Sequence, residues 1–213
     1  MISVIIPVFN GEKYLDECLS SIKNTGIEII VVNDAGTDNS ENIAKKYTDK
    51  IINISKSGPV VARNIGLKSA NGEYIMFMDA DDVLVENAID ILSQQIKGFD
   101  IVIGLRQDFI SPDCVDTYKP ISEQKKSSHG VISGCALLKK SAFDIVGDFD
   151  SDLMCGDGYD WLLRAEKSGI KINKIDSVVC HRRLHNSNMG RTLKNQECLD
   201  YVKIIRKHFT KKN

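Results

Sequence analysis

The first 80 residues alternate short apolar runs with amphipathic stretches, and few architectures accommodate such an alternation. The apolar runs are rich in β-branched residues and comprise Ser3–Val8, Glu28–Val32, Ile51–Ile54 and Tyr74–Met78. The stretches between them carry apolar residues at helical spacing, most clearly Leu15, Cys18, Leu19 and Ile22. Strand–helix units repeated at this interval predict an α/β fold, with a mostly parallel, doubly wound central sheet flanked by helices.

Polar residues directly follow three of these predicted strands. Asn10 comes after the first strand, Asp34 after the second and Asp79 after the fourth. Ligands of doubly wound sheets bind outside the carboxyl ends of the strands. We therefore expect these three side chains to border one site.

The remainder of the chain is less regular. We expect a helix over Glu86–Ile96, a strand over Asp100–Gly104 and a long loop or extension over Arg106–Gly130, where polar residues show no clear period. Further on, the pattern predicts a strand, a helix and an extended segment, at Val131–Leu138, Asp160–Ser168 and Ile170–His181.

The C-terminal segment, Asn195–Phe209, has Leu199, Val202, Ile205 and Phe209 at helical spacing and is followed by lysines. Such a cationic, amphipathic helix is suited to peripheral contact with an anionic membrane surface. A helix packed on the domain and a dimer contact are the alternatives.

Charge and composition exclude several functions. The formal net charge is −1, which offers no broad attraction for nucleic acid. The six cysteines form no C-x-x-C pair, which argues against a zinc or redox motif. The N-terminal apolar run lacks a basic leader and a cleavage pattern, so we expect a cytoplasmic protein, with the inner membrane face as its site of any peripheral contact.

The run FMDADD is the strongest chemical signal, because Asp79, Asp81 and Asp82 follow directly on a buried strand. Crowded carboxylates repel one another unless a cation or solvent relieves them. Hard divalent ions such as Mg²⁺ and Mn²⁺ prefer these oxygen ligands and also bind diphosphates. A solvated turn that caps the next helix is the alternative.

Three further runs carry candidate site residues. In VVNDAGTDNS, Asp34 can accept a hydrogen bond from a nucleobase or a ribose, although the run also suits helix capping. In SGPVVARNIG, Arg63 can steady a phosphate or pair with the aspartates. In CHRRLHNSNMG, arginine suits phosphate and neutral histidine suits a metal, with His181 and His185 both available, and a basic surface loop is the alternative.

Together these runs resemble the family-2 inverting glycosyltransferases of the GT-A fold. The resemblance spans residues 2–190 and is carried by SVIIPVFNGEKYLDECLSSI, EIIVVNDAGTDNS, GPVVARNIGLKSANGEYIMFMDADD, ISGCALLKKSAFDIVGDFD and GDGYDWLLRAEKSG. It implies a nucleotide-diphospho-sugar transferase fold and inverting transfer of a sugar to an acceptor hydroxyl, with Mn²⁺ or Mg²⁺ as cofactor.

The resemblance also implies roles for individual residues. Those of the nucleotide site are Pro7, Val8, Asn10, Glu12, Asp34, Arg63 and Asp79. Those of the metal site are Asp79, Asp81 and His181, and those near the diphosphate are Arg182, His185 and Ser187. The family's usual position for the catalytic base falls on Gly158, which is a departure, and Asp157 and Asp160 are the candidates to replace it.

We therefore expect one catalytic domain over residues 1–213, made of a nucleotide-sugar-binding half (1–105), an acceptor-side half (106–190) and the C-terminal helix (191–213). A UDP-sugar is the expected donor, with dTDP and GDP as alternatives, and a saccharide or lipid-linked saccharide is the expected acceptor. The rival hypothesis is a nucleotide-sugar-binding protein or inactive partner subunit. Dinucleotide-dependent oxidoreductases are disfavoured because the loop after the first strand lacks G-x-G-x-x-G.

Overall fold

The computed structural model describes residues 1–22, 26–118 and 127–210. Its centre is a nine-stranded sheet with the order β3-β2-β1-β4-β8-β6-β9-β5, and β7 pairs with β6. The strands are β1 (Ile2–Val8), β2 (Ile27–Asp34), β3 (Ile51–Ile54), β4 (Tyr74–Phe77), β5 (Val83–Leu84), β6 (Ile101–Ile110), β7 (Ser127–His129), β8 (Ala136–Lys139) and β9 (Ile172–Leu184).

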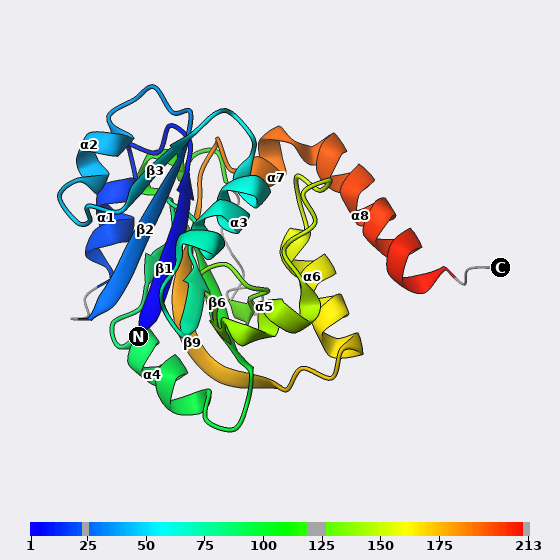
Figure 1. Ribbon diagram of the computed structural model, residues 1–213. Coiled ribbons are helices and arrows are strands. Elements are labelled where there is room, and N and C mark those ends of the chain that lie inside the picture. Colours follow the sequence, from blue (N-terminus) through cyan, green and yellow to red (C-terminus); the bar gives the residue numbers. More distant parts are fainter. Residues whose placement is uncertain (23–25, 119–126, 211–213) are drawn as a thin grey trace.

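Helices cover both faces of the sheet (Figure 1). They are α1 (Leu15–Ser20), α2 (Ser40–Ala44), α3 (Pro59–Ser69), α4 (Ala88–Gln95), α5 (Ser141–Val146), α6 (Asp157–Lys167), α7 (Met189–Thr192) and α8 (Lys194–Phe209), with a short 3-10 helix at Pro112–Cys114. Figure 1 shows α1 and α2 on one side of β1 and β2 and α3 on the other. The doubly wound α/β fold predicted from the sequence is confirmed.

The N-terminal half of the sheet is parallel, as predicted. β1 pairs in parallel with β2 and β4, and β2 pairs in parallel with β3. Because helices cover both faces, β1 is apolar over consecutive residues, and Val4, Ile5 and Ile6 are fully buried. The carboxyl ends of these strands, with Asn10, Asp34 and Asp79 just beyond them, therefore lie at one edge.

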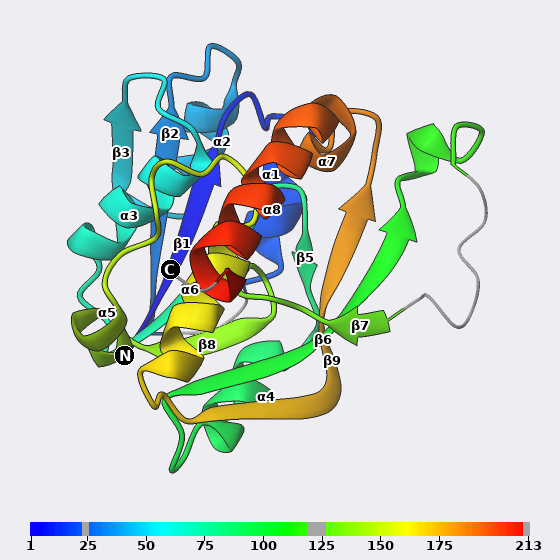
Figure 2. The same cartoon turned by 90° about the vertical axis from the view of Figure 1, so that its right-hand side faces the viewer.

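The second half of the sheet is mixed. β8 runs antiparallel to both β4 and β6, whereas β6 and β9 are parallel. Figure 2 shows β6 and β9 as two long neighbouring strands that continue beyond the rest of the sheet. The predicted parallel pairing thus describes β3, β2, β1 and β4, and antiparallel strands complete the sheet.

The prediction of a long loop over Arg106–Gly130 was wrong at both of its ends. Strand β6 continues to Ile110 because it pairs with β9 as far as Leu184, and Ser127–His129 pairs with β6 as β7. Residues 119–126 lie outside the described part of the chain. The next predicted strand begins only at Ala136, since 131–135 form a loop beside Asp79.

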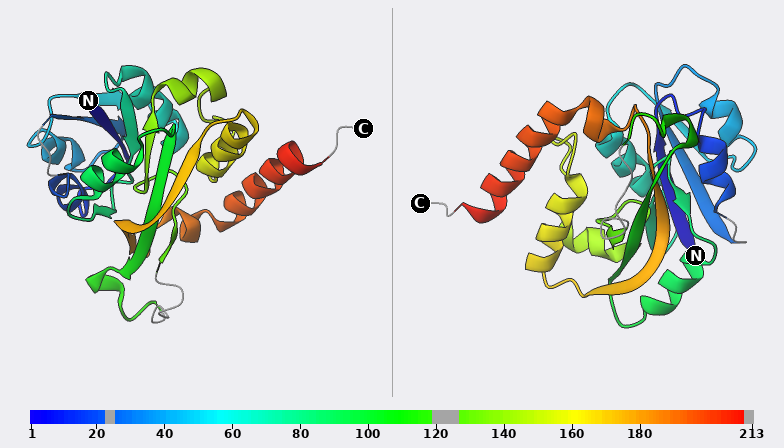
Figure 3. Two further views of the ribbon diagram at one scale, coloured as in Figure 1. Left: turned by 90° about the horizontal axis from the view of Figure 1, so that it is seen from below. Right: turned by 180° about the vertical axis from the view of Figure 1, so that it is seen from behind.

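The C-terminal helix forms as predicted, but most of its apolar stripe faces solvent and not the domain. Its buried residues are Asp200 and Ile204, whereas the residues of the predicted apolar stripe, Leu199, Val202, Ile205 and Phe209, are 43–66% exposed. Figures 1 and 3 show α8 passing α6 and projecting beyond the body of the molecule. Within the described residues, every helix is too short or too polar to cross a bilayer.

The packing of α3 on the sheet gives a first prediction. A Cβ atom at Gly66 would lie 2.3 Å from Cγ2 of Ile5 and 3.2 Å from Cγ2 of Val32. Gly66→Ala should push the helix off β1 and β2 and lower the free energy of unfolding by about 1–3 kcal/mol. Urea unfolding followed by circular dichroism measures this change. The control is Lys68→Ala on the exposed side of α3, and equal stability of the two variants would contradict the prediction.

Candidate functional site

The loops that follow β1 and β2 are joined by hydrogen bonds. Asn10 adopts φ 50° and its Oδ1 accepts a hydrogen bond from the N–H of Thr37 at 2.8 Å. Oε2 of Glu12 accepts one from the N–H of Asn39 at 3.0 Å. Pro7 and Val8, at the end of β1, are half-buried and buried. The predicted nucleotide-side residues of β1 and its loop therefore lie beside the loop after β2, and hydrogen bonds fix the two loops to each other.

Asp34 is buried and holds the start of α3. Its two carboxylate oxygens accept hydrogen bonds from the N–H groups of Ser57 and Gly58 at 2.6 and 2.9 Å. Lys56 lies 3.4 Å from Oδ2. The carboxylate thus has partners within the chain, and its contact with a nucleobase stays a prediction.

Arg63 joins two carboxylates that are far apart in the sequence. Its Nη2 donates to Asp79 at 3.0 Å and its Nη1 donates to Asp157 at 2.9 Å. Burial opposes the charged forms, but the attraction prevails: the carboxylates raise the pKa of Arg63, and the guanidinium lowers the pKa of Asp79. This ion-paired triad connects α3, the end of β4 and the first turn of α6.

The triad borders a cavity of about 170 Å³. The loop before β8 forms one wall, and two tyrosines, Tyr159 on α6 and Tyr201 on α8, form part of its lining. Asp79 and Asp157 both line this cavity, so the structure brings a residue of the Asp-x-Asp pair next to a candidate base.

Asp81 faces a different set of residues. Its Oδ2 lies 2.8 Å from Nε2 of His185 and accepts a hydrogen bond from the side chain of Asn188 at 3.2 Å. Nδ1 of His185 accepts the N–H of Ser187 at 3.3 Å, so Nε2 is the nitrogen that donates to Asp81. The Tyr14 ring lies 4.7 Å from the imidazole, between centroids, and holds it in place.

His181 and Arg182 of β9 have other partners. The ring of His181 meets the edge of Phe109 at 6.4 Å between centroids, and Arg182 lies 3.7 Å from Asp108. Of the two histidines considered from the sequence, His185 is therefore the one that contacts the aspartate pair.

Asp82 and Arg183 hold the two loops of the site together. Asp82 is buried and accepts the N–H of Arg183 at 3.0 Å. Burial, followed by the charges of Asp81 and Asp79, raises its pKa well above the usual value. Arg183 donates to the carbonyl of Asp81 at 3.0 Å and to Glu17 at 2.6 Å. Its buried guanidinium therefore serves the fold of this loop.

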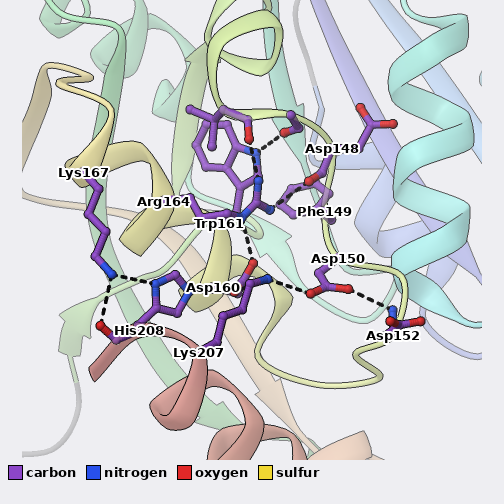
Figure 4. A network of polar contacts seen from close by, with 12 residues as sticks. Asp148, Phe149, Asp150, Asp152, Asp160, Trp161, Arg164, Lys167, Lys207 and His208 are labelled. Carbon is purple, nitrogen blue, oxygen red and sulfur yellow. Dashed lines mark hydrogen bonds and ion pairs between the residues drawn. The ribbon is translucent and has the colours of Figure 1, made fainter. Parts of the chain in front are cut away.

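Asp160 points away from the cavity, into a network between α6 and α8 (Figure 4). It is fully buried and bonds to Arg164 at 2.9 Å, Lys207 at 3.0 Å and His208 at 2.8 Å. Burial opposes its charge, but the hydrogen bonds from His208, Lys207 and Arg164 outweigh that effect and lower the pKa of Asp160. Of the two candidate carboxylates, Asp157 is therefore the one that lines the cavity.

Sequence reasoning missed several residues of the site. Asn188 and Tyr14 support Asp81 and His185, and Tyr201 lines the cavity from the C-terminal helix. No spacing rule identifies these residues, because each contact depends on segments that meet only in the folded chain. The tyrosines gave no signal beyond their ordinary aromatic character.

Comparisons with known proteins give a family match and related folds. Residues 3–147 match the family description "Glycosyl transferase family 2". The chain is 43% identical over 115 residues to the glycosyltransferase GlyG of Streptococcus pneumoniae, a match that covers 49% of this chain and 38% of GlyG. The chain thus spans well under half the length of that relative.

Solved structures show the same fold. TarS residues 1–349 of S. aureus, in complex with UDP-GlcNAc, superpose with a TM-score of 0.71 at 21% identity, over 99% of this chain and 68% of that one. The mannosyltransferase PcManGT of Pyrobaculum calidifontis, in complex with GDP-Man and Mn²⁺, gives a TM-score of 0.68 at 17% identity, over 97% and 63%. The architecture is that of GT-A glycosyltransferases.

The family match extends over more than half of the residues and includes the Asp-x-Asp run and Arg63. The chain therefore belongs to glycosyl transferase family 2.

The network around Asp160 gives a second prediction. Asp160→Asn should lower the free energy of unfolding at pH 7 by roughly 2 kcal/mol, because Arg164, Lys207 and His208 lose the carboxylate that they share. The pKa of Asp160 is lowered on folding, so its contribution is present above the unfolded value of about 3.9 and is lost as the pH falls through the folded value. Urea unfolding at pH 7 and below pH 4 should therefore show the difference from wild type shrinking in acid.

Asp144→Asn, an exposed change on neighbouring α5, is the control and should have no effect at either pH. A difference between wild type and Asp160→Asn that is constant with pH would mean that the carboxylate charge contributes nothing to the network.

Proposed function

We propose that the protein transfers a sugar from a nucleoside diphosphate sugar to an acceptor hydroxyl, with inversion and with Mn²⁺ or Mg²⁺ as cofactor. The observation that carries this proposal is the pair of carboxylates, Asp79 and Asp157, on one cavity and joined by Arg63. One belongs to the Asp-x-Asp run expected beside the donor, and the other is available to the acceptor. Membership of family 2 supports the same reaction class.

Asp157 is the proposed base. Its carboxylate oxygen accepts the proton of the acceptor hydroxyl while the oxygen of that hydroxyl bonds to the anomeric carbon. The bond from this carbon to the diphosphate breaks on the opposite face, and the diphosphate leaves with the electron pair. Arg63 orients the carboxylate at 2.9 Å. Gly158, at the family's usual position for the base, has little room for a side chain, since a Cβ atom there would lie 3.1 Å from Val131.

The residues at the end of β4 suit a cation that is shared with a substrate. Among the residues that the structure describes, no three His, Cys, Asp or Glu side chains form a complete metal-binding group. Mg²⁺ commonly takes only one or two protein carboxylates and completes its shell with phosphates and water. Asp79 and Asp81 would hold such an ion, with His185 as the nearer histidine and His181 as the alternative. When bound, the ion neutralises charge that develops on the departing diphosphate.

The two loops after β1 and β2 form the proposed nucleotide-binding side of the site. Pro7, Val8, Asn10, Glu12 and Asp34 would line the nucleoside, and Arg182, His185 and Ser187 would face the diphosphate. UDP is the proposed nucleotide, since TarS was crystallised with UDP-GlcNAc, and GDP and dTDP are the alternatives. The acceptor is a saccharide or lipid-linked saccharide, in the synthesis of cell-surface polysaccharide or glycolipid.

A second function, nucleotide-sugar binding without efficient transfer, is favoured by one observation. The family's usual base position is a glycine, and Asp157 is already ion-paired with Arg63. Both functions require the donor site. They differ in whether a base takes the proton of the acceptor hydroxyl, so that transfer occurs.

The outward face of α8 is the proposed membrane contact. It carries the exposed side chains Leu199, Val202, Ile205 and Phe209, with Lys194 and Arg206 exposed beside them. The acidic residues of the helix, Glu197 and Asp200, lie on its other side. A two-fold dimer would set this cationic face against itself, whereas an anionic lipid surface complements its charge. Such contact would keep the protein at the inner face of the membrane, next to lipid-linked acceptors.

The membrane contact predicts charge-dependent binding to vesicles. Wild type should float with vesicles of phosphatidylcholine and phosphatidylglycerol and much less with phosphatidylcholine alone, because binding combines apolar burial with attraction to anionic lipid. The variant Val202→Ser/Ile205→Ser should remain at the bottom of the gradient. The matched control, Val115→Ser/Ile145→Ser, removes two exposed apolar side chains elsewhere and should float like wild type. Equal flotation of all three proteins would refute the contact, as would concentration-dependent dimers that the α8 variant abolishes.

The catalytic proposal predicts a loss of turnover at the proposed base and a loss of nucleotide binding at the proposed metal site. Asp157→Asn should lower transfer or donor hydrolysis by at least about a hundredfold, since a general base contributes this much, and should leave UDP binding with Mn²⁺ intact. Asp81→Asn should instead weaken the binding of UDP in the presence of Mn²⁺. Thermal shift with a panel of nucleotide sugars measures binding, and release of UDP measures turnover.

Asp144→Asn, which lies away from the cavity, is the control for both measurements. Turnover that survives Asp157→Asn would remove this residue as the base. Nucleotide binding by wild type without any turnover would support the binding-protein function instead.

A further inference from the structure

Two exposed tyrosines stand together at the cavity. Their rings lie 5.9 Å apart, between centroids, at an interplanar angle of 61°, and their exposed fractions are 49% for Tyr159 and 36% for Tyr201. Neither phenol hydrogen-bonds to any residue within the described part of the chain. The hydroxyl groups and the exposed parts of both rings are therefore available to a ligand.

The cavity combines this aromatic pair with a charged interior. Arg63, Asp79 and Asp157 supply donors and acceptors, and the tyrosines supply apolar faces that end in hydroxyl groups. Sites that recognise small molecules combine apolar walls with a few placed polar groups in this way. A pyranose ring matches both parts, because its C–H face is apolar and its edge carries hydroxyls.

We propose that Tyr159 and Tyr201 form the acceptor subsite, on which a sugar ring of the acceptor stacks while one of its hydroxyls meets Asp157. This inference rests on the proposed function and adds to it the residues that would bind the acceptor sugar. It also gives α8 a part in acceptor selection, since Tyr201 belongs to that helix.

The structure holds Tyr201 against the loop that precedes Asp157 and α6. Asp200, fully buried, accepts the N–H groups of Met154 and Cys155 at 2.9 and 3.1 Å. Gly156 adopts φ 76°, and a Cβ atom there would lie 2.9 Å from Ile204 and 3.4 Å from Tyr201. The position of the aromatic ring is thus coupled to that of the proposed base.

Tyrosine variants and a glycoside panel test the subsite. The variants are Tyr201→Ala and Tyr201→Phe, with Asn195→Ala on the same helix as the control. The probes are the phenyl glycosides of glucose, galactose and N-acetylglucosamine as acceptors, and UDP-sugar hydrolysis as the reaction without acceptor. Binding of the same glycosides is followed by the NMR signals of ¹³C-labelled tyrosine rings in the absence of donor.

Tyr201→Ala should raise the KM for the best glycoside by about tenfold, the order expected for one lost stacking contact, and change hydrolysis by less than twofold. Tyr201→Phe should remain close to wild type, because the ring face is kept. Glycosides should shift the ring signals of Tyr201 in wild type and in Asn195→Ala alike.

Two outcomes would overturn the subsite. In the first, the KM changes less than twofold in Tyr201→Ala, or hydrolysis falls as much as transfer does. In the second, glycosides at high concentration leave the ring signals of Tyr159 and Tyr201 unchanged. A protein that shows ring shifts but neither hydrolysis nor transfer would refute the proposed catalysis and still support the sugar site.

Discussion

The candidate site depends on one ion-paired arrangement, in which Arg63 bridges Asp79 and Asp157. The two carboxylates belong to segments that are distant in the sequence, and without the guanidinium they would repel each other across the cavity. Arg63 is placed by α3, whose start is fixed by Asp34 and whose close approach to the sheet needs the glycine at position 66. The proposed donor side, the proposed acceptor side and the fold are therefore linked through a single side chain.

Much of the fold could be predicted because its signals are local. The apolar runs and the helical stripes give β1 to β4 and their helices, and parallel pairing then brings Asn10, Asp34 and Asp79 to one edge. The extension of β6 to Ile110 could not be predicted, since half-buried polar residues such as Gln107 are held there by pairing with β9. That pairing joins residues more than 70 positions apart in the chain, so no local sequence pattern predicts it.

The candidate site shows the same division. Carboxylates and Arg63 could be nominated from runs of sequence and from the family resemblance, and the structure brings Arg63, Asp79 and Asp157 together. The choice between His181 and His185, and between Asp157 and Asp160, required the directions of side chains on β9 and α6. Tyr201 was predicted only as part of a helix, because the sequence does not tell which side of α8 faces the domain.

The apolar stripe of α8 faces solvent, and this orientation determines how the helix is attached to the domain. Apart from Ile204 and the ring of Tyr201, its contacts with the domain are mainly polar: Asp200 accepts the N–H groups of Met154 and Cys155, and Lys207 and His208 bond to Asp160. Attachment of this kind buries little hydrocarbon, so release of α8 would change the heat capacity only slightly. Because Asp160 and Asp200 are fully buried, dissolved salt would screen these bonds only weakly. The helix is therefore joined by directional polar bonds to a core that is held by apolar burial.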